Sequence, residues 1–314
     1  MKPPILMIAP MMPSVMQALE ADYTVHRLWQ ASDRQAFVSQ VAPSVRAIAT
    51  NGSVGAGTEL IDALPNLELI ACYGVGVDAI DLMSAKARGI PVTTTPDVLT
   101  ADVADMAVAL MLATSRRLIR GDRYVRDLEW PAKGEMPLTR RVTGRRAGIV
   151  GLGRVGKALA KRLSAFEMQI SYTDIAAQPE QPFSFVSSLH ELATQSDFLI
   201  VTAAGGPVSR KMVDAKILAA LGSDGILINV SRGSIVDEDD LVAALEAGTL
   251  GGAGLDVFQN EPHVPNALFK FENVVLMPHH SSGTIESRSA MGELVVQNIN
   301  AHFAGQPLPT PFPY

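Results

Sequence analysis

The chain has 314 residues, of which 47% are hydrophobic and 18% are charged, and this is typical of a globular protein large enough for two domains. The net charge of −6, with no run of Lys or Arg, argues against a nucleic-acid partner, and the single cysteine, Cys72, excludes a disulfide framework. No apolar run is long enough to span a membrane, and the first residues have the pattern of a strand rather than of a signal peptide, so we expect a cytoplasmic protein with no membrane partner.

The first part of the chain alternates short apolar runs with segments of helical spacing. The runs predict strands at residues 5–9, 47–50, 69–73 and 90–94. Strands that alternate with helices are typical of an α/β domain with a parallel sheet. From Thr100 to about Arg123, apolar residues then recur at helical spacing, which predicts one long helix. Its apolar surface is compatible with a subunit interface and with burial in the chain's own core.

A second α/β series begins near Arg146, after a looser stretch that contains Pro and Gly. Helices are predicted between its strands and again at about 285–304. Its predicted strands are residues 147–150, 169–173, 198–202, 225–230, 252–257 and 274–277. Six strands with intervening helices are the content of a complete Rossmann fold, so we predict two doubly wound, Rossmann-like α/β domains with parallel sheets.

A glycine motif follows the first strand of the second series and begins a helix. Gly151, Gly153 and Gly156 form G-x-G-x-x-G in the context that gives this motif its meaning. The first glycine permits a tight turn, the second lets the backbone approach a pyrophosphate, and the third lets the helix pack on the strand. The helix N-terminus then offers N–H groups to the phosphates. Such glycines also form structural turns in flavodoxin-like domains, but the later segments favour dinucleotide binding.

An acidic residue ends the next predicted strand. Asp174 stands where a carboxylate accepts hydrogen bonds from the adenosine ribose and repels a 2′-phosphate. No Arg or Lys follows it closely, and Ile175 comes next. We therefore predict that NAD(H) is the preferred cofactor, with NADP(H) as the alternative.

Three polar side chains follow strand ends in the second series: Arg232, Glu261 and His279. Parallel strands bring their carboxyl ends to one edge of a sheet, where ligands bind. Reduction of a carbonyl needs an anion anchor, a proton donor and a group that tunes the donor, and this set supplies all three. Taken singly, the arginine also fits a surface ion pair, and the histidine also fits a structural role.

Together these features resemble the D-isomer-specific 2-hydroxyacid dehydrogenase family, in particular its glyoxylate/hydroxypyruvate reductase branch, which includes plant-type hydroxyphenylpyruvate reductases. The matching segments run along almost the whole chain: residues 73–78 (YGVGVD), 151–156 (GLGRVG), 229–233 (NVSRG), 254–258 (GLDVF), 260–262 (NEP) and 278–279 (PH). The resemblance implies an NAD(P)-dependent oxidoreductase that reduces a small 2-oxo acid, of the glyoxylate or hydroxypyruvate type, to the D-2-hydroxy acid.

The resemblance also implies a role for each matched residue. His279 would donate the proton, Glu261 would hydrogen-bond the histidine and keep imidazolium available, and Arg232 would bind the substrate carboxylate and carbonyl. The backbone N–H groups of Val75 and Gly76 would hold the carboxylate. The implied cofactor contacts are Gly151, Leu152, Gly153, Arg154, Val155 and Gly156 at the pyrophosphate, Val230 near the nicotinamide ring and Asp256 at its carboxamide.

In this family the chain enters the substrate domain first and returns to it at the end. We therefore place a substrate-binding (catalytic) domain at 1–98 and 282–314, the dinucleotide-binding domain at 99–281, and the active site in the cleft between them. Asn51 is a further candidate for the substrate pocket, although Asn-Gly also forms ordinary turns. The family and the apolar helix after Thr100 lead us to expect a homodimer.

Two residues depart from the family pattern. A small apolar residue often follows the catalytic histidine, whereas here His280 does, and we favour His279 as the acid because it directly follows Pro278. NADPH-preferring relatives usually carry an arginine where Ile175 stands. This favours NAD(H), although members of the branch often use NADPH.

Other functions compete with this interpretation. An arylpyruvate such as hydroxyphenylpyruvate presents the same carboxylate and carbonyl to Arg232 and His279. The fold also occurs in a transcriptional corepressor, so the alternative outside enzymes is an NAD(H)-sensing interaction protein. Formate oxidation would need a different pocket, which the residues near Asn51 do not support. No metal site is expected, because the histidines lack ligand-like spacing.

Overall fold

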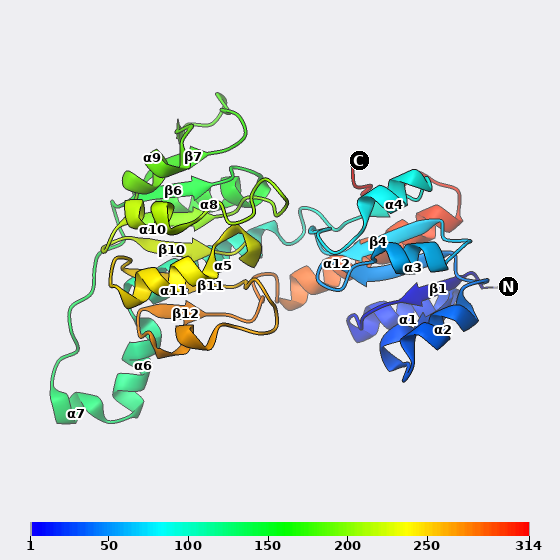
Figure 1. Cartoon of the computed structure of the whole chain (residues 1–314), viewed down its shortest axis with the longest axis horizontal. Helices are drawn as coiled ribbons and strands as arrows, with labels where there is room; N and C mark the ends of the chain where they lie inside the picture. Colours follow the sequence, from blue (N-terminus) through cyan, green and yellow to red (C-terminus); the bar gives the residue numbers. More distant parts are fainter. Residues whose placement is uncertain (1, 314) are drawn as a thin grey trace. The chain divides into compact units, whose positions relative to one another are not determined.

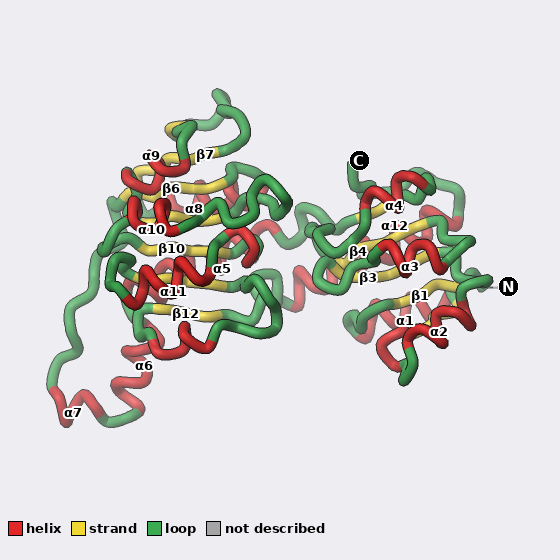
Figure 2. The backbone as a smooth tube through the Cα atoms, in the orientation of Figure 1, coloured by secondary structure: helices red, strands yellow, loops and turns green. Residues whose placement is uncertain are grey.

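The computed structural model describes residues 2–313 of the chain. They form two compact units, residues 2–99 with 282–313 and residues 100–281, each built on its own sheet (Figure 1, Figure 2). The predicted α/β class is confirmed, since both sheets are parallel and carry helices on both faces. Within residues 2–313, no helix is both long enough and apolar enough to cross a membrane.

The sheet of the first unit has five parallel strands among the described residues, in the order β2-β1-β3-β4-β5. Its strands are β1 (Pro4–Met7), β2 (Thr24–Arg27), β3 (Ala47–Asn51), β4 (Leu69–Tyr73) and β5 (Val92–Thr93). The central strands are apolar almost throughout, because helices cover both faces of a parallel sheet. Asn51 pairs in register with Tyr73, so the carboxyl ends of β3 and β4 are level.

Helices from both ends of the chain cover this sheet. One face carries α12, which lies against β4 and packs on α1, and the other carries α2, α3 and α4 (Figure 1). The apolar core on the second face includes Leu6, Ile48 and Ile70 of the strands. The bounds of these helices are α1 Pro13–Asp22, α2 Arg34–Val41, α3 Thr58–Ala63, α4 Leu82–Ala87 and α12 Ile285–Phe303.

The sheet of the second unit has seven parallel strands among the described residues, in the order β12-β11-β10-β9-β6-β7-β8. Its strands are β6 (Arg146–Val150), β7 (Gln169–Thr173), β8 (Ser184–Phe185), β9 (Phe198–Val201), β10 (Ile226–Asn229), β11 (Gly252–Leu255) and β12 (Val274–Leu276). The strand order reverses between β6 and β9, and crevices at such reversals are where ligands bind in open α/β sheets.

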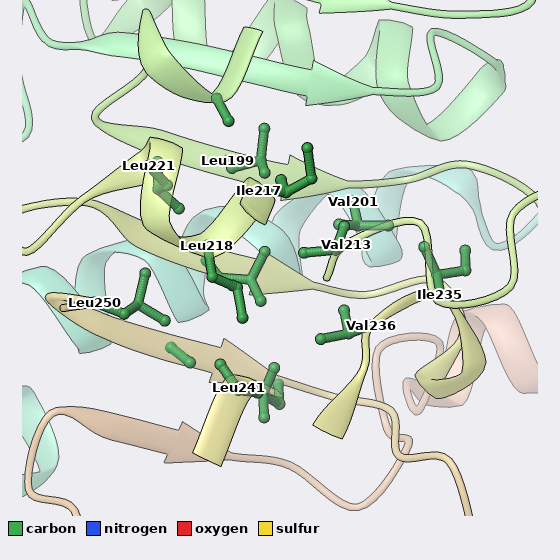
Figure 3. Close-up of a cluster of buried hydrophobic side chains, with 14 of the residues drawn as sticks. Leu199, Val201, Val213, Ile217, Leu218, Leu221, Ile235, Val236, Leu241 and Leu250 are labelled. Carbon is green, nitrogen blue, oxygen red and sulfur yellow. The ribbon is translucent and has the colours of Figure 1, made fainter. Parts of the chain in front are cut away.

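Two helix layers enclose the second sheet. On one face α5 packs on α8 and on strands β10 and β11, while α9, α10 and α11 cover the other. Figure 3 shows the second layer, in which Leu218 of α10 and Leu241 of α11 join a cluster with Leu199 of β9. The bounds of these helices are α5 Thr100–Ser115, α8 Arg154–Ala165, α9 Leu189–Thr194, α10 Ala215–Leu221 and α11 Glu238–Glu246.

Polar side chains mark several helix starts in both units. Each accepts a hydrogen bond from a backbone N–H group of the first turn, which would otherwise lack a partner. These capping residues are Asp33, Asp81, Ser188, Asp214, Asp237 and Thr284. Short 3-10 helices also occur at Leu28–Gln30, Gly233–Ile235 and Asn266–Lys270.

The prediction of one helix from Thr100 to about Arg123 is wrong. α5 ends at Ser115, Arg117 adopts a left-handed backbone with φ 49°, and α6 (Leu118–Arg126) then begins, followed by α7 (Glu129–Lys133). The apolar spacing continues across the turn, so periodicity alone does not reveal the break. Strands β2 and β8 are also absent from the sequence prediction, because neither has a buried apolar run.

Candidate active site

The ends of three neighbouring strands form the frame of the candidate site. Asn229 of β10 pairs with Leu255 of β11, which pairs with Leu276 of β12, so the three carboxyl ends are level. Loops that leave these ends carry the polar residues predicted from the sequence. The side chains in question are Arg232, Asp256, Glu261 and His279.

A short hydrogen bond joins two of these loops. The Glu261 carboxylate oxygen Oε2 lies 2.6 Å from Nδ1 of His279, and Oε1 accepts the Phe258 N–H at 2.9 Å. The glutamate is therefore held by its own loop while it contacts the histidine. Because Nδ1 faces the carboxylate, Nε2 is the ring nitrogen left to meet another molecule.

Charge around Glu261 keeps its carboxylate ionised. Burial alone would raise the pKa of the Glu261 carboxyl, but hydrogen bonds from His279 and from the Phe258 N–H outweigh it. The positive charges of His279 and Arg232 act in the same direction, so the pKa lies below its ordinary value. Arg232 is thus close enough to Glu261 for its positive charge to lower the pKa of the carboxyl.

The turn that carries Arg232 is fixed by its neighbours. Asn229 accepts the Ser231 N–H at 3.1 Å and donates to the Arg232 carbonyl at 2.9 Å. A Cβ at Gly233 would lie 1.9 Å from the Phe258 carbonyl carbon, so only glycine lets this turn pack against the Glu261 loop. The Arg232 Nη1 donates to the Ser231 carbonyl at 2.7 Å. The arginine and the Glu261–His279 pair thus belong to one packed cluster of loops.

A second acidic residue supports the Glu261 loop from α11. Glu238 is 9% exposed, and its Oε1 accepts the Gln259 N–H at 2.6 Å. Burial raises the pKa of Glu238, the Gln259 N–H lowers it, and the nearby carboxylates Asp239 and Glu261 raise it, with a net increase. Sequence analysis missed this residue, because nothing local distinguishes a buried glutamate from other acids at a helix start.

The glycine motif has the geometry of a phosphate-binding turn. Gly151 has φ 90° and lies against Ala203, and a Cβ at Gly156 would lie 2.3 Å from the Gly151 carbonyl oxygen. At Gly153, by contrast, a Cβ would meet no atom within 4 Å. Gly153 is also the N-cap of α8 and provides no side-chain cap. The first and third glycines are thus needed for packing, while the second borders open space at a helix N-terminus, which fits a dinucleotide pyrophosphate.

Asp174 lies beside this turn. Val150 and Thr173 pair in register, so Asp174 follows β7 at the level where Gly151 follows β6. One carboxylate oxygen accepts the Leu152 N–H at 2.8 Å and the Gln178 amide at 3.2 Å, and the other accepts the Ile175 N–H at 2.7 Å. The aspartate therefore holds the glycine turn in place, and its contact with the ribose stays a prediction. No sequence signal indicates the contribution of Gln178.

Of the remaining predicted cofactor residues, Val230 is buried directly after β10, and Leu152 is buried within the glycine turn. Arg154 is exposed and Val155 half-buried in the first turn of α8. Asp256 is fully buried, and its carboxylate accepts hydrogen bonds from the chain itself. The structure thus brings the predicted residues of the second unit to the carboxyl edge of its sheet.

In the first unit, two loops meet at the carboxyl ends of β3 and β4. A Cβ at Gly52 would lie 2.6 Å from the Gly76 carbonyl oxygen, so glycine is required for this approach. Within residues 2–313, the backbone N–H groups of Val75 and Gly76 donate no hydrogen bond, and Val75 is exposed. The Asn51 side chain accepts the N–H groups of Ser53 and Val54 at 3.1 and 2.8 Å. Its oxygen thus forms an Asx turn that shapes the loop.

No group of three or more His, Cys, Asp or Glu side chains within residues 2–313 is placed to hold a metal ion.

Comparison with known proteins identifies the same regions. The model of a family described as D-isomer specific 2-hydroxyacid dehydrogenase, NAD binding domain, matches residues 108–281. Over 307 residues the chain is 46% identical to a hydroxyphenylpyruvate reductase from Plectranthus scutellarioides, with 98% of each chain covered.

Solved structures agree over nearly the full length. A 2-hydroxyacid dehydrogenase from Ketogulonicigenium vulgare Y25 is 51% identical, with a TM-score of 0.93 over 99% of this chain and 98% of that one. An NADPH-dependent glyoxylate/hydroxypyruvate reductase from Sinorhizobium meliloti, in complex with NADP and malonate, is 42% identical, with a TM-score of 0.94 over 99% and 97%.

Proposed function

The chain belongs to the D-isomer-specific 2-hydroxyacid dehydrogenase family, and from that membership we propose that it reduces a small 2-oxo acid of the glyoxylate or hydroxypyruvate type. Family membership makes it a nicotinamide-dependent oxidoreductase that forms D-2-hydroxy acids. The hydrogen bond between Glu261 and His279, next to Arg232, carries the assignment to this chain, because these are the groups that carbonyl reduction needs.

His279 acts as the acid in this proposal. Its Nε2 gives a proton to the substrate oxygen while Nδ1 stays bonded to Glu261 at 2.6 Å. The ionised carboxylate stabilises the protonated ring and holds its orientation. Arg232 binds the substrate carboxylate and carbonyl through its planar guanidinium. The backbone N–H groups of Val75 and Gly76, which donate no hydrogen bond within residues 2–313, are the carboxylate donors that this proposal assigns to the first unit, the proposed substrate-binding domain.

The second unit is the dinucleotide-binding domain in this proposal. The bound nicotinamide supplies the hydride for the substrate carbon. Gly151 to Gly156 and the start of α8 hold the pyrophosphate, since Gly153 borders open space and α8 has no side-chain cap. Val230, buried directly after β10, would contact the nicotinamide ring, and Asp256 would bind its carboxamide.

NAD(H) is the preferred cofactor. The Asp174 carboxylate lies at the end of β7, where it accepts hydrogen bonds from the ribose hydroxyls and repels a 2′-phosphate. The next side chain, Ile175, is fully exposed and offers no positive charge. The relative from Sinorhizobium meliloti is NADPH-dependent, so both cofactors belong in the test.

The experiment measures loss of reduced-nicotinamide absorbance with NADH and NADPH separately, against glyoxylate, hydroxypyruvate and 4-hydroxyphenylpyruvate. We expect turnover with NADH and the small acids, and a D-configured product from hydroxypyruvate. Fast turnover of 4-hydroxyphenylpyruvate alone would instead assign an arylpyruvate reductase, the activity named for the Plectranthus relative. Tight NADH binding with no turnover of any acid would favour a nucleotide-sensing protein and contradict the proposal.

The working form is a homodimer. α6 and α7, together with the segments that follow them, expose large apolar side chains that a monomer would leave in water. These are Leu118, Ile119, Val125, Leu128, Trp130 and Leu138. Light scattering coupled to gel filtration gives the mass directly, and a monomeric mass at working concentration would contradict this part of the proposal.

A further inference from the structure

The backbone of His279 adopts a conformation that a histidine rarely takes. Its φ is 51°, in the left-handed region, which costs a residue with a Cβ about 1 kcal/mol or more. Such a conformation persists only where the surrounding structure holds it. The direction of the His279 side chain toward Glu261 depends on this backbone, so the residues that hold the backbone also hold the proton donor.

Those contacts come from one buried residue, through its backbone carbonyl and its carboxylate. Asp256 is fully buried directly after β11, and its backbone carbonyl accepts the His279 N–H at 2.8 Å. Its Oδ1 accepts the His280 N–H at 2.7 Å. Its Oδ2 accepts the Ser281 N–H at 2.9 Å and also the Ser281 hydroxyl. One residue thus binds every backbone N–H from His279 to Ser281.

No cation within residues 2–313 forms an ion pair with Asp256, so these hydrogen bonds are the compensation for burying its charge. Hydrogen bonds to an ionised acceptor are about twice as strong as neutral ones, and a low-dielectric interior strengthens them further. The three-residue segment is therefore held firmly just where the left-handed residue would otherwise relax.

We propose that Asp256 and the Ser281 hydroxyl form a buried clamp that positions His279 for proton transfer. Asp256 and Ser281 act here as positioning residues, through the backbone of residues 279–281. The inference rests on the proposed function and deepens it, since it explains how the proton donor is held. It also gives the Asp256 carboxylate a task separate from the nicotinamide carboxamide.

Ser281→Ala tests the clamp without touching Asp256 or His279 themselves. The matched control is Ser196→Ala, because both serines are 5% exposed and each donates its hydroxyl to one acceptor of the second unit. Ser196 bonds the Leu192 carbonyl and lies at the amino end of β9, away from the strand ends that carry the site. Both variants thus lose a hydrogen bond from a buried hydroxyl, but only Ser281→Ala loses it beside His279.

We expect Ser281→Ala to lower kcat about tenfold, since small misplacements of reacting groups cost up to about 100-fold. The alkaline limit of the kcat/KM profile should move to lower pH, because a looser Glu261 contact stabilises the protonated histidine less. The Kd for NADH, measured by fluorescence, should not change. Ser281→Thr keeps the hydroxyl and should restore the pH profile. Ser196→Ala should have the kcat and pH profile of the wild type.

A wild-type kcat and pH profile in Ser281→Ala would overturn the clamp and leave the proposed function standing. Asp256→Asn separates the two tasks of the carboxylate: a fall in kcat at constant NADH affinity supports the clamp, and a weaker NADH affinity at constant kcat overturns it.

If the wild type turns over no acid, the proposed function fails. The low-field NMR signal of the Nδ1 proton, identified by its loss in His279→Gln, then tests the clamp directly. We expect it to be broadened in Ser281→Ala, and an unchanged signal would overturn the inference.

Discussion

The Glu261 carboxylate and the His279 ring are 18 residues apart in the chain, yet Oε2 and Nδ1 lie 2.6 Å from each other. We predict that Glu261→Gln lowers kcat by about 10- to 100-fold, since a positioned acid contributes at least that much. Because the pKa of Glu261 is lowered, its carboxylate stays charged at and above pH 4.5, the ordinary pKa, and loses its charge only at lower pH. The Glu261 charge should therefore be present across neutral pH in the wild type, and the variant, which lacks that charge, should lose activity at lower alkaline pH. Profiles of kcat/KM against pH check this, with exposed Glu286→Gln as the control.

Arg232 should act on the substrate more than on the cofactor. Arg232→Ala should raise KM for the 2-oxo acid by about 10- to 100-fold, because hydrogen bonds to charged groups are worth about 1.5–3 kcal/mol. Arg232→Lys should recover only part of this, since it lacks the planar fork. Steady-state kinetics with Arg210→Ala, an exposed arginine of the same unit, provide the comparison. An unchanged KM in Arg232→Ala would remove the anchor role.

The glycine motif separates folding from cofactor binding. Gly156→Ala would place a Cβ 2.3 Å from the Gly151 carbonyl, so we expect a lower unfolding temperature even without cofactor. Gly153→Ala meets no atom within 4 Å, so its unfolding temperature should match the wild type while NADH binds about tenfold more weakly. Thermal unfolding and NADH fluorescence titration distinguish the two. Full NADH affinity in Gly153→Ala would contradict the proposed pyrophosphate site.

Asp174 should govern the choice of cofactor. Asp174→Ala removes the charge that repels a 2′-phosphate, so the ratio of kcat/KM with NADPH to that with NADH should rise about tenfold or more. NADH efficiency should also fall, because the Leu152 N–H loses its acceptor. The two effects are separated by measuring each cofactor alone. A ratio equal to that of the wild type would leave the ribose contact without support.

Glu238 should make the folded state less stable at neutral pH than at acid pH. Its pKa is raised by burial, so folding disfavours its ionised form, and stability falls as pH rises from the ordinary pKa of 4.5 through the raised one. Glu238→Gln keeps an acceptor for the Gln259 N–H but carries no charge. Its unfolding temperature should exceed the wild type by about 2 °C at pH 7 and match it near pH 4. A difference that does not vary with pH would contradict this.

Much of the fold is predictable because its signals are local. The strands of the second sheet are short apolar runs, and the glycine motif sits between a strand and a helix, so β6, β7 and β9 to β12 agree with prediction within a few residues. Where local signals are weak, prediction fails. β2 is half-buried, β8 is an exposed edge pair, and the left-handed Arg117 breaks an otherwise continuous helical pattern.

The expected residues at the strand ends are Arg232, Glu261 and His279, and the structure shows them on adjacent loops. Their roles stay predictions, as do the homodimer, the preference for NAD(H) and the cytoplasmic location. The residues that hold these side chains in place are beyond sequence reasoning. Glu238 and Ser281 bond partners that only folding brings near, namely the Gln259 N–H and the Asp256 carboxylate.

The sequence by itself determined the class of the protein: its apolar periodicity specifies parallel α/β units, and its motifs specify a nicotinamide-dependent dehydrogenase of 2-hydroxy acids. Only the tertiary structure decided how His279 is presented. The histidine has a left-handed backbone, and its ring contacts Glu261 at 2.6 Å. Buried Asp256 accepts the backbone N–H groups of residues 279–281. These hydrogen bonds join loops that follow different strands. Composition and spacing record what each segment prefers alone, whereas hydrogen bonds between distant loops exist only after the sheet has set its strands in register.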